Sequence, residues 1–562
     1  MNTFSILDYA IFIGYACVIM FIGLFVSRTK KGQAKSSQDY FLASRSLAWW
    51  AIGASIIASN ISAEQFIGMS GSGFAIGLGI ASYEFIAAAT LIIVAVFFLP
   101  IYLKANIYTM PQFLEIRYDK RVKTIMAFFW LLVFIFVNLT SILYLGALAI
   151  NKIMEIDMFW SIFSLALFAG IYSIYGGLKA VAITDLVQVV FLIGGGLLTT
   201  YISLDYYSGG QGGVVGFQML LENVPEKFDL ILDKNNPNYS YLPGVGVILG
   251  GLWVSALYYF GCNQYIIQRA LATKNLHEAQ LGLLFAGFLK IILPLIVVIP
   301  GIVAFALEAP IDKPDQAYPW LMHSFIPSGI KGIAFAALVA AVVSSLASMI
   351  NSISTIFTMD IYKEYVTRKE TSEKKLVNIG RLFGIFSLII AVCIAPLLGT
   401  LEQAFQFIQE FTGFVSPGAL AIFILGFFWK KASANGAIAA AIGTFVFSLL
   451  MLYLFPEISF INRMGYVFLL CALIIVIFGL VCPNTKLANT IELNAKLFRT
   501  TTLFKILSIL ILAILCVIYY IFWWIKLSRN AFHFLFHPNK SQNDVYLFQE
   551  RITEFVKFVI VH

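Results

Sequence analysis

Two charged side chains lie within long apolar stretches of the sequence, where charges are rare. Glu84 lies in IGLGIASYEFIAAATLIIVAVFF and Lys290 in LLFAGFLKIILPLIVVIPG. A charge at the centre of a bilayer costs about 2.5–3.5 kcal/mol on insertion scales, so an intramembrane charge indicates a functional site by default. A carboxylate accepts hydrogen bonds from hydroxyl groups, and an ammonium group donates to them. We therefore expect both residues to contact a polar solute, with a structural ion pair between them as the alternative.

Three amide side chains and three aromatic rings accompany these charges in other apolar stretches. Amides both donate and accept hydrogen bonds. Donors and acceptors beside aromatic faces are what a neutral sugar or polyol requires of a binding site. The amides are Asn60, Gln65 and Gln409, and the rings are Tyr83, Tyr259 and Phe405.

A pair of hydroxyl groups, Ser344 and Ser345, lies in the apolar run AALVAAVVSSLASMINS. Serine in a helix often bonds back to a carbonyl one turn earlier, which is the structural interpretation. Paired hydroxyls beside unwound carbonyls instead make an oxygen cage for a hard cation. A neutral cage suits a weakly held monovalent ion that must bind and leave in each cycle.

Two apolar stretches are interrupted by polar residues near their middle. They are AIGASIIASNISAEQFIGMSGSG (51–73) and GVILGGLWVSALYYFGCNQYIIQR (246–269). Unwound backbone survives at membrane depth only where it lines a protein cavity or a water-filled path. Transporters use such breaks to direct free carbonyls at ions and free amides at substrates. Gly and Ser that merely help helices to pack are the alternative.

The elements that must position these residues are membrane-spanning helices. The chain has 562 residues, of which 60% are hydrophobic and 12% charged, and its mean hydropathy is +0.88. Soluble domains carry about 25% charged residues. Apolar stretches of nearly 20 residues recur along the chain, and we expect about fourteen spans. The first has no basic residue before it and is predicted to be a permanent span rather than a signal peptide.

The two interrupted spans each begin a group of five, which predicts an inverted repeat of five plus five helices in an all-α membrane protein. The predicted divisions are 1–46 (an extra span and a cytoplasmic loop), 47–203 (first repeat), 204–242 (an outer surface loop), 243–428 (second repeat), 429–525 (additional spans) and 526–562 (a divergent tail).

Basic residues indicate the orientation of the spans. Loops predicted to lie inside hold roughly four times as many Lys and Arg residues as the outer segments. The N-terminus is therefore expected outside, and the net charge of +8 is attributed to topology rather than to nucleic-acid binding. The six cysteines form no CxxC pair. The sequence has no nucleotide-binding fingerprint and no evident nucleophile–base pair, so we expect neither an enzyme nor an organic cofactor.

Several long motifs resemble the sodium:solute symporter family, and most closely its bacterial sodium/galactose symporters. They are ASNISAEQFIGMSGSGFAIGL, IYGGLKAVAITDLVQV, NQYIIQR, FLKIILPLIVVIPGI, VSSLASMINSISTIFTMDIYKEY and FQFIQEFTGFVSPGALAIFILGFFWKK. The resemblance covers roughly residues 7–450. It implies a LeuT-type inverted repeat with flanking helices, sodium as the coupling ion, and location in a plasma or bacterial inner membrane.

The resemblance also implies roles for individual residues. The sodium site would use the carbonyls of Ala58, Ile61 and Ala341 and the hydroxyls of Ser344 and Ser345, with Asp185 on the ion's exit path. The sugar pocket would be Asn60, Gln65, Glu84, Lys290 and Gln409. The gate below the sugar would be Tyr259, and the gate above it Met69, Tyr83 and Phe405.

Two positions depart from the galactose carriers. Ala256 stands where they have an asparagine, and Ala87 where they have a serine. Each change removes a hydrogen-bond partner, and a site that lacks such partners discriminates less between hydroxyl patterns. A different hexose, a deoxy-sugar or a polyol therefore remains open as the substrate.

The predicted function is sodium-coupled import of a sugar or polyol by alternating access. The nearest alternative is the same fold carrying a carboxylate or an amino acid. A membrane sensor that binds solute without transport and an ion channel are more distant alternatives. The sequence leaves the oligomeric state and the sodium stoichiometry open.

Overall fold

The computed structural model describes residues 4–26, 36–367, 372–400, 404–482 and 493–527. These residues are helical apart from their connections and one isolated bridge between Leu47 and Thr273. Eleven helices in this part of the chain are long and apolar enough to cross a membrane, or twelve when one bent pair is counted as a span. The protein is thus a multi-pass membrane protein, as the composition predicts.

The N-terminal half contains one flanking helix and the elements that carry the first break. The chain starts with α1 (Ile6–Val26), α2 (Ser37–Leu42) and η1 (Ala43–Arg45). It continues with α3 (Trp49–Asn60), η2 (Glu64–Met69), α4 (Ser70–Ala75), η3 (Leu78–Ala81), α5 (Ser82–Ile93), η4 (Val94–Phe98), α6 (Leu99–Ala105) and α7 (Met110–Arg117). After these come α8 (Lys120–Val133), η5 (Phe134–Leu139), α9 (Thr140–Met154), α10 (Met158–Gly176) and α11 (Leu178–Tyr207).

The remainder begins with a connecting segment that contains α12 (Gly213–Asn223) and η6 (Pro225–Phe228). The second break follows in α13 (Val245–Leu249), α14 (Leu252–Gly261) and α15 (Gln264–Leu271). Next are α16 (Leu276–Ala306), η7 (Pro314–Gln316), α17 (Ala317–Phe325), α18 (Ile330–Ile356), η8 (Phe357–Val366), α19 (Glu373–Ile394), η9 (Ala395–Thr400), α20 (Ala404–Gly413) and α21 (Ser416–Phe428). The last helices are α22 (Ala434–Leu454), α23 (Phe460–Val481) and α24 (Thr502–Leu527).

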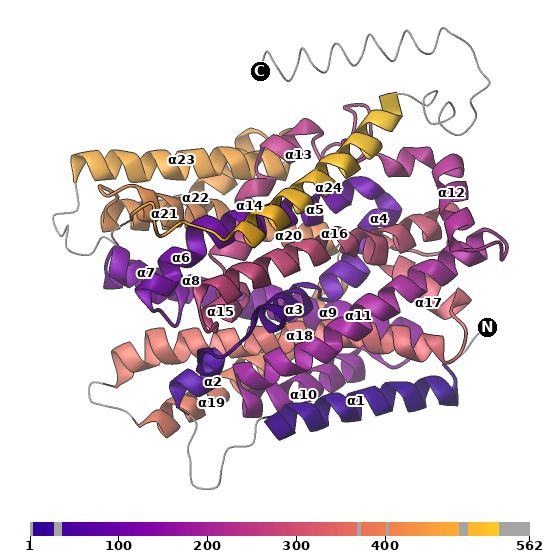
Figure 1. Cartoon of the computed structure of the whole chain (residues 1–562), viewed down its shortest axis with the longest axis horizontal. Helices are drawn as coiled ribbons and strands as arrows, with labels where there is room; N and C mark the ends of the chain where they lie inside the picture. Colours follow the sequence, from indigo (N-terminus) through magenta and orange to yellow (C-terminus); the bar gives the residue numbers. More distant parts are fainter. Residues whose placement is uncertain (1–3, 27–35, 368–371, 401–403, 483–492, 528–562) are drawn as a thin grey trace.

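The longest helices lie roughly parallel, with α11, α16 and α18 among them (Figure 1). The short helices α12 and α17 lie near one end of this bundle, at the right of the view, and α2 and α7 lie near the other. Small residues allow close packing at the centre, as expected between membrane helices. A Cβ on Gly301 of α16 would overlap the carbonyl oxygen of Ser70 in α4. The backbones of α16 and α4 therefore meet directly.

The first predicted break is present at residues 61–63. The last turn of α3 closes with Ile61 N donating to the Ile57 carbonyl at 2.8 Å. The next amide, that of Ser62, donates at 3.0 Å to Oε1 of Gln65 instead of to the Ala58 carbonyl, which a continuing helix would use. The chain then resumes as the π-helical turn η2, a feature frequent at functional sites. The side chain of Gln65 thus stabilises the interruption of the helix.

The second predicted break is present between Gly261 and Gln264. The helices on its two sides differ in direction by 49°. The hydroxyl of Tyr102 donates to the Gly261 carbonyl at 2.7 Å, so this freed acceptor in the protein interior is satisfied. In each break one freed backbone group thus finds a partner within the protein: the Ser62 amide in the first and the Gly261 carbonyl in the second.

The span count differs from the prediction of about fourteen. Two predicted spans are not among the twelve. One is the first broken helix, whose pieces α3, η2 and α4 are each short. The other is α10, whose apolar stretch Met158–Ile171 is shorter than the helices counted as spans. The segment 204–242, expected to be an ordinary surface loop, instead contains α12 and η6 and packs on the bundle. Its Gly216 lies so close to the Leu204 carbonyl of α11 that a Cβ would overlap it.

Candidate functional site

The two intramembrane charges meet at the centre of the bundle. Lys290 of α16 lies with its Nζ 2.5 Å from Oε2 of Glu84 on α5. The same ammonium donates to Oδ1 of Asn60, the last residue of α3 before the first break. Lys290 is 1% exposed and Glu84 3%. The structural ion pair is therefore present, and it also joins the two charges to the broken helix.

This polar cluster continues to the second broken helix. Asn60 Nδ2 donates to the hydroxyl of Tyr259 on α14 at 2.9 Å. The Tyr259 hydroxyl in turn shares a hydrogen bond with the hydroxyl of Tyr265 on α15, beyond the break. The predicted pocket residues Asn60, Glu84 and Lys290 thus form one continuous chain of hydrogen bonds with the predicted lower gate.

Two apolar positions lie beside this cluster. Ala87 follows Glu84 by three residues on α5, and Ala256 precedes Tyr259 by three residues on α14, so each lies about one helical turn from a cluster member. Ala87 is 3% exposed and Ala256 8%. Neither side chain can form a hydrogen bond. The cluster therefore has fewer polar groups beside it than the asparagine and serine of the galactose carriers would provide.

The residues predicted as the upper gate lie around η2. The rings of Tyr83 and Phe405 meet edge to face with centroids 5.4 Å apart. Phe405 also covers Gly68, where a Cβ would lie 2.8 Å from the Phe405 Cβ. Met69, the next residue of η2, is fully buried. The aromatic pair thus connects α5 and α20 and lies against η2, which follows the first break.

Two predicted pocket residues are not hydrogen-bonded to the cluster. Gln65 accepts from the amide and the hydroxyl of Ser62, both at 3.0 Å, and so acts within its own turn. Gln409 is half-buried on α20, which packs against η2. Among the described residues, neither amide bonds to Glu84 or Lys290.

The residues of the predicted sodium site lie where α3 meets α18. Ser345 Oγ donates at 2.8 Å to the carbonyl of Ser59, within the last turn of α3. Ser344 Oγ instead donates at 2.5 Å to Oδ1 of Asp185 on α11. The set Ala58, Ile61, Ala341, Ser344 and Ser345 is fully buried. The amide of Ser62 donates elsewhere, as described above, so the Ala58 carbonyl is left without its helical donor.

A buried guanidinium that sequence reasoning missed continues the network from Asp185. Asp185 Oδ2 accepts from Ser55 Oγ at 2.5 Å, and Ser55 Oγ accepts from Nε of Arg269 on α15 at 3.0 Å. Arg269 also donates to Ser348 of α18, which is hydrogen-bonded to Ser59 of α3. The signal was present in NQYIIQR, but Arg269 stands at the end of its predicted span and looked like a loop charge.

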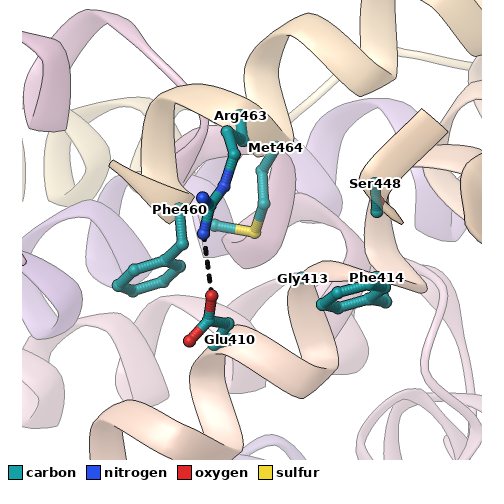
Figure 2. A pocket seen from close by; sticks show the side chains of 7 residues that line it. All are labelled: Glu410, Gly413, Phe414, Ser448, Phe460, Arg463 and Met464. Atoms are coloured by element: carbon teal, nitrogen blue, oxygen red, sulfur yellow. Dashed lines mark hydrogen bonds and ion pairs between the residues drawn. The ribbon is translucent and has the colours of Figure 1, made fainter. Parts of the chain in front are cut away.

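A separate pocket lies between α20, α22 and α23 (Figure 2). It is a shallow pocket that is open to the surface. Arg463 and Glu410 form an ion pair of 2.8 Å across it. The pocket contains none of the predicted site residues, although α20 also carries Gln409 and Phe405. Its lining is Glu410, Gly413, Phe414, Ser448, Phe460, Arg463 and Met464.

The sequence is similar to several known transporters. The chain is 50% identical over 537 residues to the sodium/glucose cotransporter of Vibrio parahaemolyticus, which covers 92% of this chain and 98% of the relative. It is 32% identical to the sodium/myo-inositol cotransporter 2 of Oryctolagus cuniculus, over 76% of this chain and 67% of the relative. It is also 33% identical to the uncharacterized symporter YidK of Escherichia coli, over 86% of this chain and 85% of the relative.

Solved structures establish the fold. A sodium-coupled sialic acid symporter in a substrate-bound outward-open state superposes with a TM-score of 0.74 at 23% identity, over 85% of this chain and 99% of that one. A nucleobase-cation-symport-1 family transporter in a closed conformation gives a TM-score of 0.50 at 11% identity, over 81% of this chain and 98% of that one. The fold is therefore the LeuT type that the resemblance implied. The profile of the sodium:solute symporter family matches residues 40–443, and the chain belongs to this family.

Proposed function

We propose that this protein is a sodium-coupled symporter that carries a sugar or a related polyol across a cell membrane. The observation that carries the proposal is the buried cluster of Glu84, Lys290 and Asn60 between the two broken helices. The cluster offers an ammonium, a carboxylate and an amide, which together donate to and accept from hydroxyl groups. The names of the glucose and myo-inositol cotransporters that the chain resembles support a sugar or polyol.

Ion and solute would be coupled through the first break. Ala58 and Ile61, proposed sodium ligands, flank Asn60, whose side chain bonds both Lys290 and Tyr259. A cation drawn to the carbonyls of residues 58 and 61 would fix the backbone of that turn. It would thereby fix the position of the Asn60 amide in the solute cluster. Sodium binding then organises the pocket, with Gln65 and Gln409 as its further proposed polar contacts.

We propose that the gates lie on opposite sides of this cluster. Tyr259, whose hydroxyl accepts from Asn60, would close the cluster from below, and Tyr83, Phe405 and Met69 would close it from above; the contact between the Tyr83 and Phe405 rings supports the second assignment. Alternating access would open one side at a time. Asp185, hydrogen-bonded to Ser344, would receive the ion as it leaves.

Charge in the cluster favours a neutral solute over a carboxylate. Lys290 is already paired with Glu84 at 2.5 Å, so an anion would have to compete with a carboxylate held in place by the fold. Ala87 and Ala256 offer no hydrogen-bonding group at two edges of the cluster. We therefore expect glucose-like hexoses, deoxy-sugars or polyols to be accepted at least as well as galactose.

The proposed orientation places the N-terminus and the loop 204–242 outside and the loops rich in Lys and Arg inside. The bacterial relative supports a cell membrane as the location. We further propose residues 47–203 and 243–428 as the two inverted repeats, since each opens with one of the broken helices. Of the predicted tail 526–562, residues 526 and 527 belong to the end of α24, and residues 528–562 lie outside the described residues.

Uptake into proteoliposomes tests the proposed function. Labelled glucose, galactose, 2-deoxyglucose and myo-inositol are each offered with and without an inward sodium gradient. We expect accumulation of at least one of them above its outside concentration only when the gradient is present. Uptake of none of them by folded, reconstituted protein would contradict the proposal, as would uptake that does not depend on sodium.

Ser345→Ala is expected to weaken sodium binding. The variant removes one proposed ligand and the hydrogen bond to Ser59, a loss of about 0.5–1.5 kcal/mol. The sodium concentration for half-maximal uptake should therefore rise roughly 3- to 10-fold. Ser387→Ala is the matched control, because Ser387 is also buried and bonds only to the carbonyl one turn earlier in α19. Equal sodium dependence in both variants would exclude Ser345 from the sodium site.

A further inference from the structure

A buried lysine in the segment 208–244, which connects α11 to α13, lies against the end of the first broken helix. Lys227 of η6 donates from Nζ to the carbonyls of Phe74 at 2.8 Å and Ala75 at 2.9 Å. These are the last two residues of α4. Nζ also lies 3.7 Å from the centre of the Phe305 ring on α16. The side chain therefore contacts two helices of the transport core from outside them.

The position suits an ammonium group. Carbonyls at a helix C-terminus lack intrahelical donors and carry the negative end of the helix dipole. Asn238, from the same segment, also donates to the Ala75 carbonyl, at 3.2 Å. Burial lowers the pKa of Lys227 to about 8 while Glu226 opposes this change, so the group is mainly protonated at neutral pH. A charged cap and an amide thus hold the end of α4.

The backbone of the segment fits the turn that follows α4. Gly77 has φ +100°, and a Cβ there would overlap the carbonyl oxygen of Lys227. A Cβ on Gly79 would lie 3.1 Å from the carbonyl oxygen of Asp229. Residues 227–229 therefore lie directly on the turn between α4 and η3. Side chain and backbone together fasten the segment at this point.

The same segment is fastened to α11 at its other end. Gly216 of α12 lies against the carbonyl of Leu204, and Gly212 N donates to Oδ1 of Asp205 at 2.8 Å. The segment thus bridges α11 and the outer end of the broken helix. That broken helix carries Gln65 and Met69 in η2, immediately before α4.

We propose that Lys227 is a positioning residue for transport, which clamps the segment 208–244 onto the end of α4 so that the segment follows η2 and α4 when they move. The inference rests on the proposed function, since only transport requires the broken helix to move. The clamp holds the outer end of the helix that carries two proposed pocket and gate residues. Its release would leave that end without a fixed position relative to α11.

Limited proteolysis of the full-length protein in detergent, at pH 7, tests the clamp. Cleavage within the exposed stretch 233–235 is compared for wild type, Lys227→Met and Lys227→Arg. We expect Lys227→Met to be cut about ten-fold faster, because the cap is lost, and Lys227→Arg to remain close to wild type. Lys152→Met is the control for removal of a lysine charge, since Lys152 is an exposed lysine of α9 and leaves the cleaved stretch unchanged. Wild-type cleavage should also change when sodium and solute are added, and this response should vanish in Lys227→Met.

Uptake kinetics complete the test. In Lys227→Met we expect a maximal rate reduced about five-fold or more with a thermal midpoint near wild type, and rescue by Lys227→Arg. If Lys227→Met does not fold, Asn238→Ala, which removes the second donor to Ala75, should show the same changes more weakly. Proteolysis and uptake of Lys227→Met equal to those of Lys152→Met would overturn the clamp. Absence of wild-type uptake would count against the proposed function instead, while the proteolysis comparison would still decide the clamp.

Discussion

Lys290→Met is expected to abolish uptake of the solute and to destabilise the protein. The substitution leaves the Glu84 carboxylate buried without its cation, which costs about 3–5 kcal/mol. It also removes a donor from the proposed pocket and frees the Asn60 side chain. Loss of charged hydrogen bonds at a buried site corresponds to a fall in uptake of about 100-fold or more. Uptake in proteoliposomes and thermal unfolding in detergent measure the two effects.

The double variant Lys290→Met, Glu84→Gln separates folding from binding. With both charges removed, the desolvation cost of the pair disappears, and the double variant should be more stable than Lys290→Met alone. It should nevertheless remain unable to accumulate the solute, since the ammonium and the carboxylate are both gone. Lys152→Met, at an exposed lysine in the last turn of α9, is the control for removal of a lysine charge. A double variant that transports normally would show that the pair is structural only.

The breaks in the helices were predictable because they depend on local sequence. Asn60 and Ser62 place polar side chains within an apolar run, and Gln65 then accepts from the backbone of the turn. The Cys262–Asn263 step interrupts the second helix in the same way. Glu84 and Lys290 were found because each stands alone among apolar residues. These features need no knowledge of which helices are neighbours.

The network around Arg269 could not be predicted in this way. It joins α3, α11, α15 and α18 through hydroxyl groups that also occur on many helices as ordinary packing residues. Its members become a set only when the rotation and contacts of four helices are known. The role of Lys227 could not be predicted either. Its partners are backbone carbonyls about 150 residues earlier in the chain, and the pattern of side chains in a sequence does not indicate which backbone carbonyls a lysine contacts.

The two buried charge clusters have similar designs and different locations. In one, Lys290 and Glu84 are in direct contact beside the Asn60 amide. In the other, Asp185 and Arg269 are bridged by the hydroxyl of Ser55. A hydroxyl bridge can exchange its partners for an ion or water more readily than a direct ion pair can separate. We therefore expect the second cluster to rearrange when sodium passes Asp185.

Asp185→Asn is expected to be the most harmful single change in this second cluster. Asn retains the shape of the side chain but leaves the Arg269 guanidinium, which is fully buried, without a negative charge nearby. The expected loss of stability is about 3–5 kcal/mol, and Arg269→Gln should cause a loss of the same order. The double variant Asp185→Asn, Arg269→Gln should recover most of it, as measured by thermal unfolding in detergent.

Transport by the double variant then distinguishes a role in sodium release from a role in folding alone. If Asp185 receives the outgoing ion, the folded double variant should show a maximal uptake rate lowered about ten-fold or more at saturating sodium and solute. Ser345→Ala differs, because it is expected to act mainly on the sodium concentration for half-maximal uptake. A stable double variant with the wild-type maximal rate would assign the cluster a purely structural role. In that case the route of the ion from Ser344 and Ser345 would have to avoid α11.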